Sequence, residues 1–356
     1  MKVLRRRSYL VAKMKKLKRE LFAKAAVEVS ILEKKLLTKA QLERILRAEN
    51  FQQVQSLLLA AGYRHFPTHG VEQLRIHTLL NAYLADFLEE LLAVSPPDSS
   101  EYLDMLLLDF DLHNIQVALV QRQGGSAVAN HIIAVPQSRH AYYAERLAQR
   151  EPDGSYFAML LDGAEEKFLE NPRAAQEWLD RVYYKRLVSL GKTSGIELFA
   201  SYAEAKADFY NLLTLLRIRS IHARSTDIPA ATAAELCESL MVAGGSLPTD
   251  FFAKLFSVGT EAIGKALEDT KYRRVFTQGL AHYSYENDAA LVEKEMDNYL
   301  TRMVAAKRYT ALGPESLFGY LYARRIEVTN LRLALAVRLQ GLPEASARER
   351  LRELYV

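Results

Sequence analysis

The sequence predicts an all-α protein built from three similar helical units. Helix breakers are scarce, with 16 glycines and 10 prolines among 356 residues, against an average usage of about 12% for the two together. Apolar residues recur at the three- and four-residue spacing of a helix, and the alternation typical of a strand is nowhere sustained. A short polar motif occurs three times along the chain. These observations favour long packed helices over a sheet with many turns.

The first element is a basic segment. Residues 1–24 carry ten lysines and arginines against one acid, Glu20, so their net charge is +9 and the remaining residues sum to −5. Leucines and a methionine are interleaved with the basic residues, which is an amphipathic pattern. We expect a solvated helix whose other face packs on the body or on a partner helix. A nucleic-acid site would usually spread positive charge over the folded domain as well, so no nucleic-acid partner is expected.

Helical spacing continues through the body of the chain. Leu42, Ile45 and Leu46 open an apolar stripe that continues to residue 58, and residues 296–305 form a similar one. The best candidate for a strand, residues 131–136, is short and flanked by loop residues. No run approaches the 18 apolar residues that indicate a membrane-spanning helix.

Cysteine and histidine usage argues against a metal centre. The single cysteine, Cys237, excludes an intrachain disulfide and a cysteine-based zinc cluster, fits a reducing, cytoplasmic compartment and lies in a helical pattern, so we expect a small buried hydrophobe. His65, His69 and His77 form the densest histidine group, but a proline and a glycine interrupt any helix between them, so we expect no metal role. Glycine-rich phosphate loops and nucleophile elbows are absent from the sequence. No metal or cofactor is expected.

The repeated motif is an acid, an asparagine three residues later, an apolar stretch, and an arginine eight residues after the asparagine. Its three copies are Asp111, Asn114 and Arg122; Asp208, Asn211 and Arg219; and Glu327, Asn330 and Arg338. Only these three of the nine asparagines meet all the conditions. Upstream, residues 58–64 resemble residues 267–273, each with a tyrosine followed by an arginine. The copies are domain-sized intervals apart, which predicts a basic extension at 1–26 and units at 27–125, 126–225 and 226–356.

Two interpretations of the motif compete. Residues i and i+3 share a helix face, and an asparagine within a helix costs a few tenths of a kcal/mol, so its amide should have a specific partner. We favour a polar clasp, in which the acid and the asparagine satisfy backbone groups of a neighbouring helix or loop. A ligand or metal site is the alternative, but a site needed once would not recur in all three units.

Asp109 and Asp111 suggest a sharper chemistry. An apolar run followed by Asp-x-Asp resembles the nucleophile motif of haloacid-dehalogenase-like phosphatases, or a terpenoid-synthase-like magnesium site. The first needs a strand–loop–helix context, whereas these surroundings predict a helix, and the second needs another acid-rich motif. A metal-dependent enzyme that uses these acids would bind Mg²⁺, and the substitution Asp111→Asn would abolish this binding. We expect no catalytic residue in the chain.

With the three motifs in place, the chain resembles the C subunit of V-type (A/V-type) ATP synthases, which corresponds to the d subunit of vacuolar ATPases. The strongest likeness is the Glu-x-x-Asn-Leu-Arg helix at 320–338, the glycine turn at 341–343 and the terminal helix to Val356. The two earlier motifs and residues 36–46 also resemble the family, so the similarity covers residues 27–356. The family has a tyrosine close before Leu36, whereas Tyr9 lies 27 residues before it, so residues 1–26 are an extension.

The resemblance implies three helical domains around a pseudo-threefold axis, forming a funnel. Such a subunit sits peripherally on the cytoplasmic face of the membrane proteolipid ring, receives the central shaft in its cavity and turns with the rotor. It would couple shaft and ring for ATP-linked transport of H⁺ or Na⁺ without catalysing a reaction. It would reach the membrane through the complex only and be a monomer in isolation. The alternative is a free-standing helical adaptor, whose domains would stack in a line.

Overall fold

The structure is a computed structural model of the 356-residue chain. It describes residues 18–63, 73–96, 100–122, 133, 163–164, 166–167, 171–224, 229–286, 289–340 and 343–356. Within these residues every regular element is a helix and none is a strand, which confirms the predicted all-α class. Of the candidate strand at 131–136, only Ile133 falls within the described residues, and it has no regular structure.

The chain begins with short helical elements. The 3₁₀ turns η1 (Arg19–Phe22) and η2 (Glu33–Lys35) flank α1 (Ala23–Leu32), and α2 (Lys39–Arg47) and α3 (Phe51–Ala60) follow. The apolar stripe from Leu42 to residue 58 is therefore broken into two helices. The break arises because the Asn50 side chain accepts a hydrogen bond from the Gln53 N–H and so begins α3. A reciprocal capping box between Thr38 and Gln41 begins α2 in a similar way.

Three long helices carry the repeated motif near their middles. They are α5 (Ser100–Arg122), α9 (Glu197–Arg224) and α15 (Glu315–Gln340). Each follows another helix, namely α4 (Gln73–Val94), α8 (Pro172–Thr193) and α14 (Ala289–Ala305). The shorter helices are α10 (Ala230–Leu240), α11 (Thr249–Lys254), α12 (Thr260–Glu268), α13 (Arg273–Glu286) and α16 (Glu344–Arg350).

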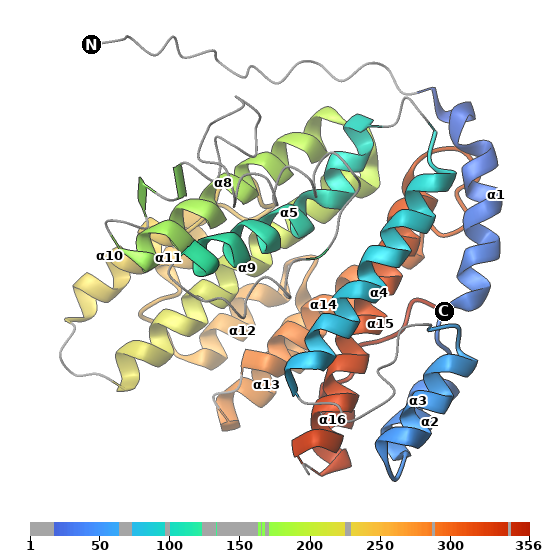
Figure 1. The fold of residues 1–356 in the computed structure, drawn as a ribbon. Coiled ribbons are helices and arrows are strands. Elements are labelled where there is room, and N and C mark those ends of the chain that lie inside the picture. Colours follow the sequence, from blue (N-terminus) through green and yellow to red (C-terminus); the bar gives the residue numbers. More distant parts are fainter. Residues whose placement is uncertain are drawn as a thin grey trace.

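The helices pack in an order that joins the two ends of the chain. Helix α8 contacts both α5 and α9, and α14 contacts both α9 and α15. Helix α4, which comes before the first motif helix, packs along α15, the last one (Figure 1). Helices α1 and α2 also contact α15. The final long helix thus contacts elements from the beginning of the sequence as well as its neighbours α14 and α16.

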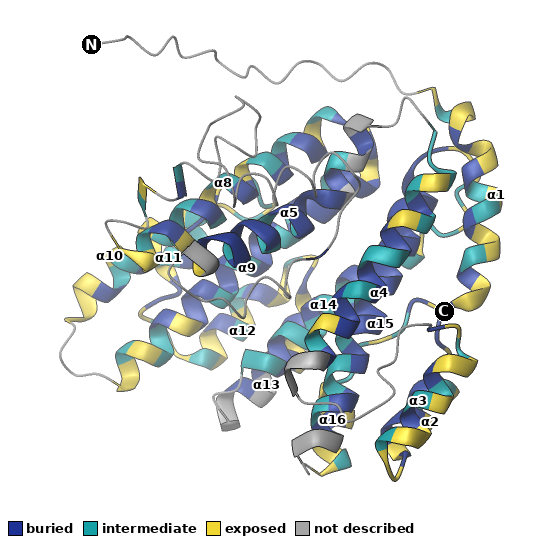
Figure 2. Cartoon of the chain, in the orientation of Figure 1, coloured by how far each residue is buried: buried dark blue, intermediate teal, exposed yellow. Residues whose placement is uncertain are grey.

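The interior is a continuous apolar core in which the motif helices are deeply buried (Figure 2). Helix α9 buries residues on all of its faces, as expected of a helix enclosed by neighbours. Gly191 permits the close approach of α8 to α9, since a Cβ there would lie 2.8 Å from the Phe199 carbonyl oxygen. Cys237 is fully buried, as predicted, and burial raises the pKa of its thiol to about 11. In the part of the chain that is described, no helix is long and apolar enough to cross a membrane.

Candidate functional site: polar clasps on the three long helices

The three motif asparagines make the same pair of hydrogen bonds. Each amide nitrogen donates to a backbone carbonyl, and each amide oxygen accepts from the N–H of the same residue. Asn114 binds Ile133 in this way at 2.9 and 2.9 Å, Asn211 binds Val242 at 2.9 and 2.8 Å, and Asn330 binds Arg352 at 3.0 and 2.8 Å. All three asparagines are fully buried. An amide suits this position because it carries a donor and an acceptor and so matches a peptide group.

The partners of two asparagines occupy equivalent places. Val242 is the second residue after α10, and Arg352 is the second residue after α16. In both cases the helix ends in a residue of extended conformation, Met241 or Leu351, and the next residue pairs with the asparagine. Helices α9 and α15 thereby fix the chain that returns from a short helix.

The acid of α9 holds a second segment. Asp208 accepts hydrogen bonds from the Ser246 N–H at 2.9 Å, the Ser246 hydroxyl at 2.7 Å and the Leu247 N–H at 3.1 Å. The Tyr272 hydroxyl also donates to it at 2.7 Å. A Cβ at Gly245 would lie 2.0 Å from an Asp208 carboxylate oxygen, so the loop approaches the acid closely only because residue 245 is glycine.

The acid of α15 makes an equivalent set of contacts with the beginning of the chain. Glu327 accepts hydrogen bonds from the Leu37 N–H and, at 3.0 Å, from the Tyr63 hydroxyl. Arg324 of the same helix adds an ion pair at 2.8 Å, and both side chains are 2% exposed. Burial raises the pKa of Glu327, although Arg324 acts in the opposite direction. The carboxylate is therefore costly to bury and depends on all three partners.

Asp208 and Glu327 bind equivalent positions of two helix pairs, α11–α12 and α2–α3 respectively. Leu247 lies two residues before α11 and Leu37 two residues before α2, while Tyr272 and Tyr63 follow α12 and α3 and belong to the two segments that resemble each other in sequence. Each tyrosine lies upstream of one copy of the motif but bonds to the acid of another copy. At the corresponding position of α5, Asp111 is also buried.

The motif arginines are described in one copy. Arg219 donates through one guanidinium nitrogen to the carbonyls of Leu255 at 2.9 Å, Phe256 at 3.0 Å and Val258. It thus provides hydrogen-bond donors to carbonyl groups just after α11, which have no partner N–H within the helix. The side chains of Arg122 and Arg338 lie outside the described residues.

A charged group that the sequence analysis missed lies between the long helices. Asp109 of α5 forms an ion pair with Arg325 of α15, accepts a hydrogen bond from Tyr183, and lies 3.9 Å from the Lys206 ammonium of α9. Burial acts to raise the pKa of Asp109, but Arg325 and then Lys206 outweigh it and hold this pKa well below its usual range. Because α5 provides Asp109 from a helix, not a strand, the phosphatase-like interpretation of this acid fails.

The three charged residues occupy the same place in each repeat. Asp109, Lys206 and Arg325 each precede the motif acid by two residues. Two aromatic residues also share one repeat position. Phe199 and Phe318 each lie nine residues before the motif acid of their own helix, and the centroids of their rings are 5.1 Å apart. The equal offset and the opposite charges at it are the signal in the sequence from which this contact could have been predicted.

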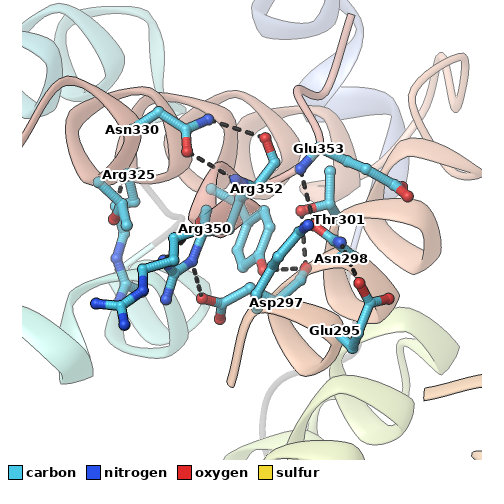
Figure 3. A network of polar contacts seen from close by, with 12 residues as sticks. Glu295, Asp297, Asn298, Thr301, Arg325, Asn330, Arg350, Arg352 and Glu353 are labelled. Carbon is cyan, nitrogen blue, oxygen red and sulfur yellow. Dashed lines mark hydrogen bonds and ion pairs between the residues drawn. The ribbon is translucent and has the colours of Figure 1, made fainter. Parts of the chain in front are cut away.

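The C-terminal segment is held by two helices (Figure 3). Beside the Asn330 clasp, the Arg352 guanidinium forms an ion pair with Asp297 of α14 at 3.0 Å. The Glu353 N–H donates to the Asn298 side chain at 2.7 Å. This is the part of the chain in which the family-like sequence pattern is strongest, and the residues that carry the pattern make packing contacts.

A groove of about 780 Å³ borders this C-terminal segment. Its basic lining residues include Lys39, Arg274, Lys294 and Arg348, interspersed with glutamates. A second groove of about 580 Å³ shares Arg274 and adds three basic residues. Among the described residues, no group of three or more His, Cys, Asp or Glu side chains could hold a metal ion. The motif residues whose contacts the structure describes bind backbone, hydroxyl and guanidinium groups of the protein itself.

Comparison with known proteins identifies relatives over most of the chain. Residues 25–350 match the family described as ATP synthase (C/AC39) subunit. The C subunit of the A-type ATP synthase of Methanosphaera stadtmanae is 21% identical over 337 residues, covering 89% of this chain and 84% of the relative. That of Methanobrevibacter smithii is 22% identical with the same coverage, and that of Desulfurococcus sp. is 22% identical, covering 92% of this chain and 88% of the relative.

Proposed function

Because the chain belongs to the ATP synthase (C/AC39) subunit family, we propose that it is a non-catalytic rotor subunit that couples the central shaft to the membrane proteolipid ring. In this proposal it acts as a socket on the cytoplasmic face of the membrane. The shaft enters its cavity, and torque passes through it between the soluble ATPase head and the ring. The subunit itself makes and breaks no bond.

The observation that carries this proposal is the contact between the last unit and the first. Glu327 binds Leu37 and Tyr63, whereas Asp208 binds Leu247 and Tyr272 in the same manner. If each acid holds the helix pair of the next unit, the last acid closes the series on the first pair. A linear stack would leave the final acid without such a partner. Closure therefore favours three units around an axis over an adaptor with units in a line.

The charged group between the long helices supports the same arrangement. Residues at one repeat position come together when the repeats surround a common axis, and the contacts of Asp109 with Arg325 and Lys206 are consistent with such an arrangement. We propose that the axis of the funnel passes near them, with units at 27–125, 126–225 and 226–356. In this arrangement the helix pair α2–α3 of the first unit packs on the last unit, where it binds Glu327.

The clasps suit a part that must transmit torque. Each asparagine and acid binds main-chain groups in a buried site, where a hydrogen bond is costly to break without replacement. Tight packing of the apolar core resists deformation as well. In this proposal Asp111, Asn114, Asp208, Asn211, Glu327 and Asn330, with the three motif arginines, hold the body rigid, and binding to other subunits uses different residues.

The two grooves that share Arg274 are candidates for contact with another subunit. They lie on neighbouring helices and present basic residues beside glutamates, a mixed-charge surface that favours one orientation of a charged partner. We propose that one central-stalk subunit binds there. Substitution of Arg274 by glutamate should weaken that binding, because the residue is exposed and borders both grooves.

Co-purification tests the proposed function. An affinity-tagged chain, expressed in its own cells and isolated in mild detergent, should bring with it stalk and proteolipid subunits, while the purified chain alone should be a monomer without ATPase activity. Failure to recover any stalk or ring subunit would contradict the proposal. Small-angle scattering distinguishes the proposed subunit from a free-standing adaptor, because units in a line give a longer maximum dimension than units closed around an axis.

A further inference from the structure

Each of the three long helices has one face that is less buried than the rest. Between Leu317 and Val337 of α15, every residue is buried except five that share one side of the helix, namely Arg325, Thr329, Arg332, Leu333 and Ala336. Three of these positions, counted from the motif acid, are also partly or fully exposed on the other helices: Asp109, Gln116 and Val120 on α5, and Lys206, Leu213 and Arg217 on α9. Because Asp109 contacts Arg325 and Lys206, these faces are turned toward one another at that level.

Exposure of this face increases toward the C-terminal ends of the helices. Nine residues before the motif acids, Tyr102, Phe199 and Phe318 are at most 5% exposed, and the two phenylalanine rings are in contact. Two residues before the acids, the charged side chains are 15%, 24% and 33% exposed. Nine residues after them, Val120 is 48% exposed and the Arg217 side chain 60%. The facing sides of the helices therefore touch at one end and are open toward the other.

Arg332 lies on this face of α15 without a partner. It follows Arg325 by seven residues, which places it about 10 Å further along the same side of the helix. Its Nε is buried and has no hydrogen-bond partner. Burial lowers the pKa of its guanidinium, and among the described residues no acid opposes this effect. The equivalent residues of the other helices, Gln116 and Leu213, carry no charge that could balance it. A positive charge that is partly withdrawn from water and left unpaired is costly.

The facing sides of the long helices carry more positive than negative charge. Asp109 is shared by Arg325 and Lys206. The next acid that acts on Lys206 is Asp297, which already forms another ion pair. At the two levels of Asp109 and Arg332, the facing residues therefore provide three cations and one anion, a net charge of 3 − 1 = +2. This part of the protein can accept a negative charge from outside the chain.

We propose that the Arg332 guanidinium binds a carboxylate of the central shaft, at the place where the shaft enters between the long helices. This inference rests on the proposed coupling role and adds the chemistry of one contact to it. A guanidinium presents two parallel N–H donors that match the two oxygens of a carboxylate. The carboxylate would supply the partner that Arg332 lacks and would reduce the excess charge by one.

The surroundings of Arg332 favour an acidic side chain of a protein over a polyanion. Nucleic acid is bound by many basic groups that follow its phosphates, whereas the excess here is two charges. A bilayer surface is flat, but Arg332 lies on a face that is turned toward other helices. Leu213, at the same level of α9, is partly exposed and aliphatic. A narrow protein end that combines apolar and acidic side chains matches this combination.

Calorimetric titration of the full chain with purified shaft subunits tests the inference. Arg332→Gln removes the charge and should weaken shaft binding at least tenfold, and Arg332→Glu should weaken it further because it opposes two like charges. Arg332→Lys keeps the charge and should bind within about fivefold of the parent. The matched control is Arg181→Gln, which removes the same charge from an exposed position of α8 that borders neither groove. This control should bind like the parent.

Thermal melting of the chain without the shaft separates recognition from packing. Because the Arg332 Nε has no partner in the isolated chain, Arg332→Gln should melt at the same temperature as the parent or higher. A residue needed for packing would lose melting temperature and shaft binding together. Such a joint loss would overturn the inference, and so would shaft binding by Arg332→Gln that equals the parent's.

The remaining outcomes separate this inference from the proposed function. If the parent and Arg332→Gln bind the shaft equally, the coupling role stands and the inference fails. If the parent binds no shaft subunit, both fail. If millimolar sulfate raises the melting temperature of the parent but not of Arg332→Gln, and shaft binding is equal in the two, Arg332 binds a free anion and the shaft assignment is wrong. Weaker shaft binding by a variant that melts like the parent supports the assignment.

Discussion

Removing the negative charge of Asp109 tests whether the long helices are held together where their equivalent residues meet. Asp109→Asn keeps the shape of the side chain but removes the partner of Arg325 and the nearest acid to Lys206. Two cations from different helices would then lie close together in a largely buried site. The Tyr183 hydroxyl can still donate to the amide oxygen, so the substitution isolates the charge.

The magnitude follows from burial. Breaking a fully buried ion pair by removing one partner costs about 3–5 kcal/mol of stability. The Asp109 side chain is 15% exposed, but those of Lys206 and Arg325 are 24% and 33% exposed, so water screens part of the remaining charge. We therefore expect Asp109→Asn to lower the free energy of unfolding by about 2–3 kcal/mol, after discounting the buried-pair cost for this screening.

Urea denaturation at pH 7, followed by circular dichroism, measures this difference. The matched control is Asp104→Asn on the same helix, because Asp104 pairs with Arg186 at 3.3 Å and both side chains are about one-third exposed. The control should lose less than about 1 kcal/mol, as exposed pairs do. Equal losses in the two variants, or a loss below about 1 kcal/mol for Asp109→Asn, would refute the reasoning.

Three further predictions concern the Asp208/Asn211 clasp and the Asp109 ion pair. Asn211→Ala should lower the free energy of unfolding by about 2–4 kcal/mol, because it leaves the buried N–H and carbonyl of Val242 without their partner; a calorimetric loss below about 1 kcal/mol would contradict this. Gly245→Ala should cost about 1–3 kcal/mol, since the methyl group would displace Asp208, and parent-like thermal stability would disprove the close approach. The pKa of Asp109 is lowered by folding, so its stabilisation is complete above the unfolded-state pKa of about 3.9 and is lost as the pH falls through the lower folded-state value. The difference in unfolding free energy between the parent and Asp109→Asn should therefore narrow from about pH 5 downwards, and a constant difference would be inconsistent with this origin.

The helical class could be predicted because its signals are local. Scarce glycine and proline and the 3.6-residue spacing of apolar side chains act within one helix and require no knowledge of its neighbours. The division between α2 and α3 was missed, since Asn50 interrupts the helix through one side-chain hydrogen bond while the apolar spacing continues across the break. Packing of α4 and α1 on α15 depends on residues more than 200 positions apart, which periodicity does not reveal.

The candidate site shows the same division between local and distant information. An asparagine within an apolar helix indicates that a buried amide has a partner, and the repeat identified three such residues. The identity of each partner, such as Val242 or Arg352, depends on how the following chain returns to the helix. The sequence segments around Tyr63 and Tyr272 resemble each other, but the acid that each tyrosine binds belongs to a copy of the motif other than the one that follows it. Asp109 was considered only with Asp111, as an Asp-x-Asp motif, so its pairing with Arg325 at the same offset of another copy was not predicted.

The most direct test of the central claim is reconstitution of the junction between shaft and ring. Purified shaft subunits and detergent-solubilised proteolipid ring are mixed with and without this chain, and the assemblies are separated by size and weighed by native mass spectrometry. We predict that a complex of shaft and ring forms only when the chain is present, and that it contains one copy of the chain. Association of shaft and ring that is equally strong without the chain, or a chain that binds neither, would contradict the account.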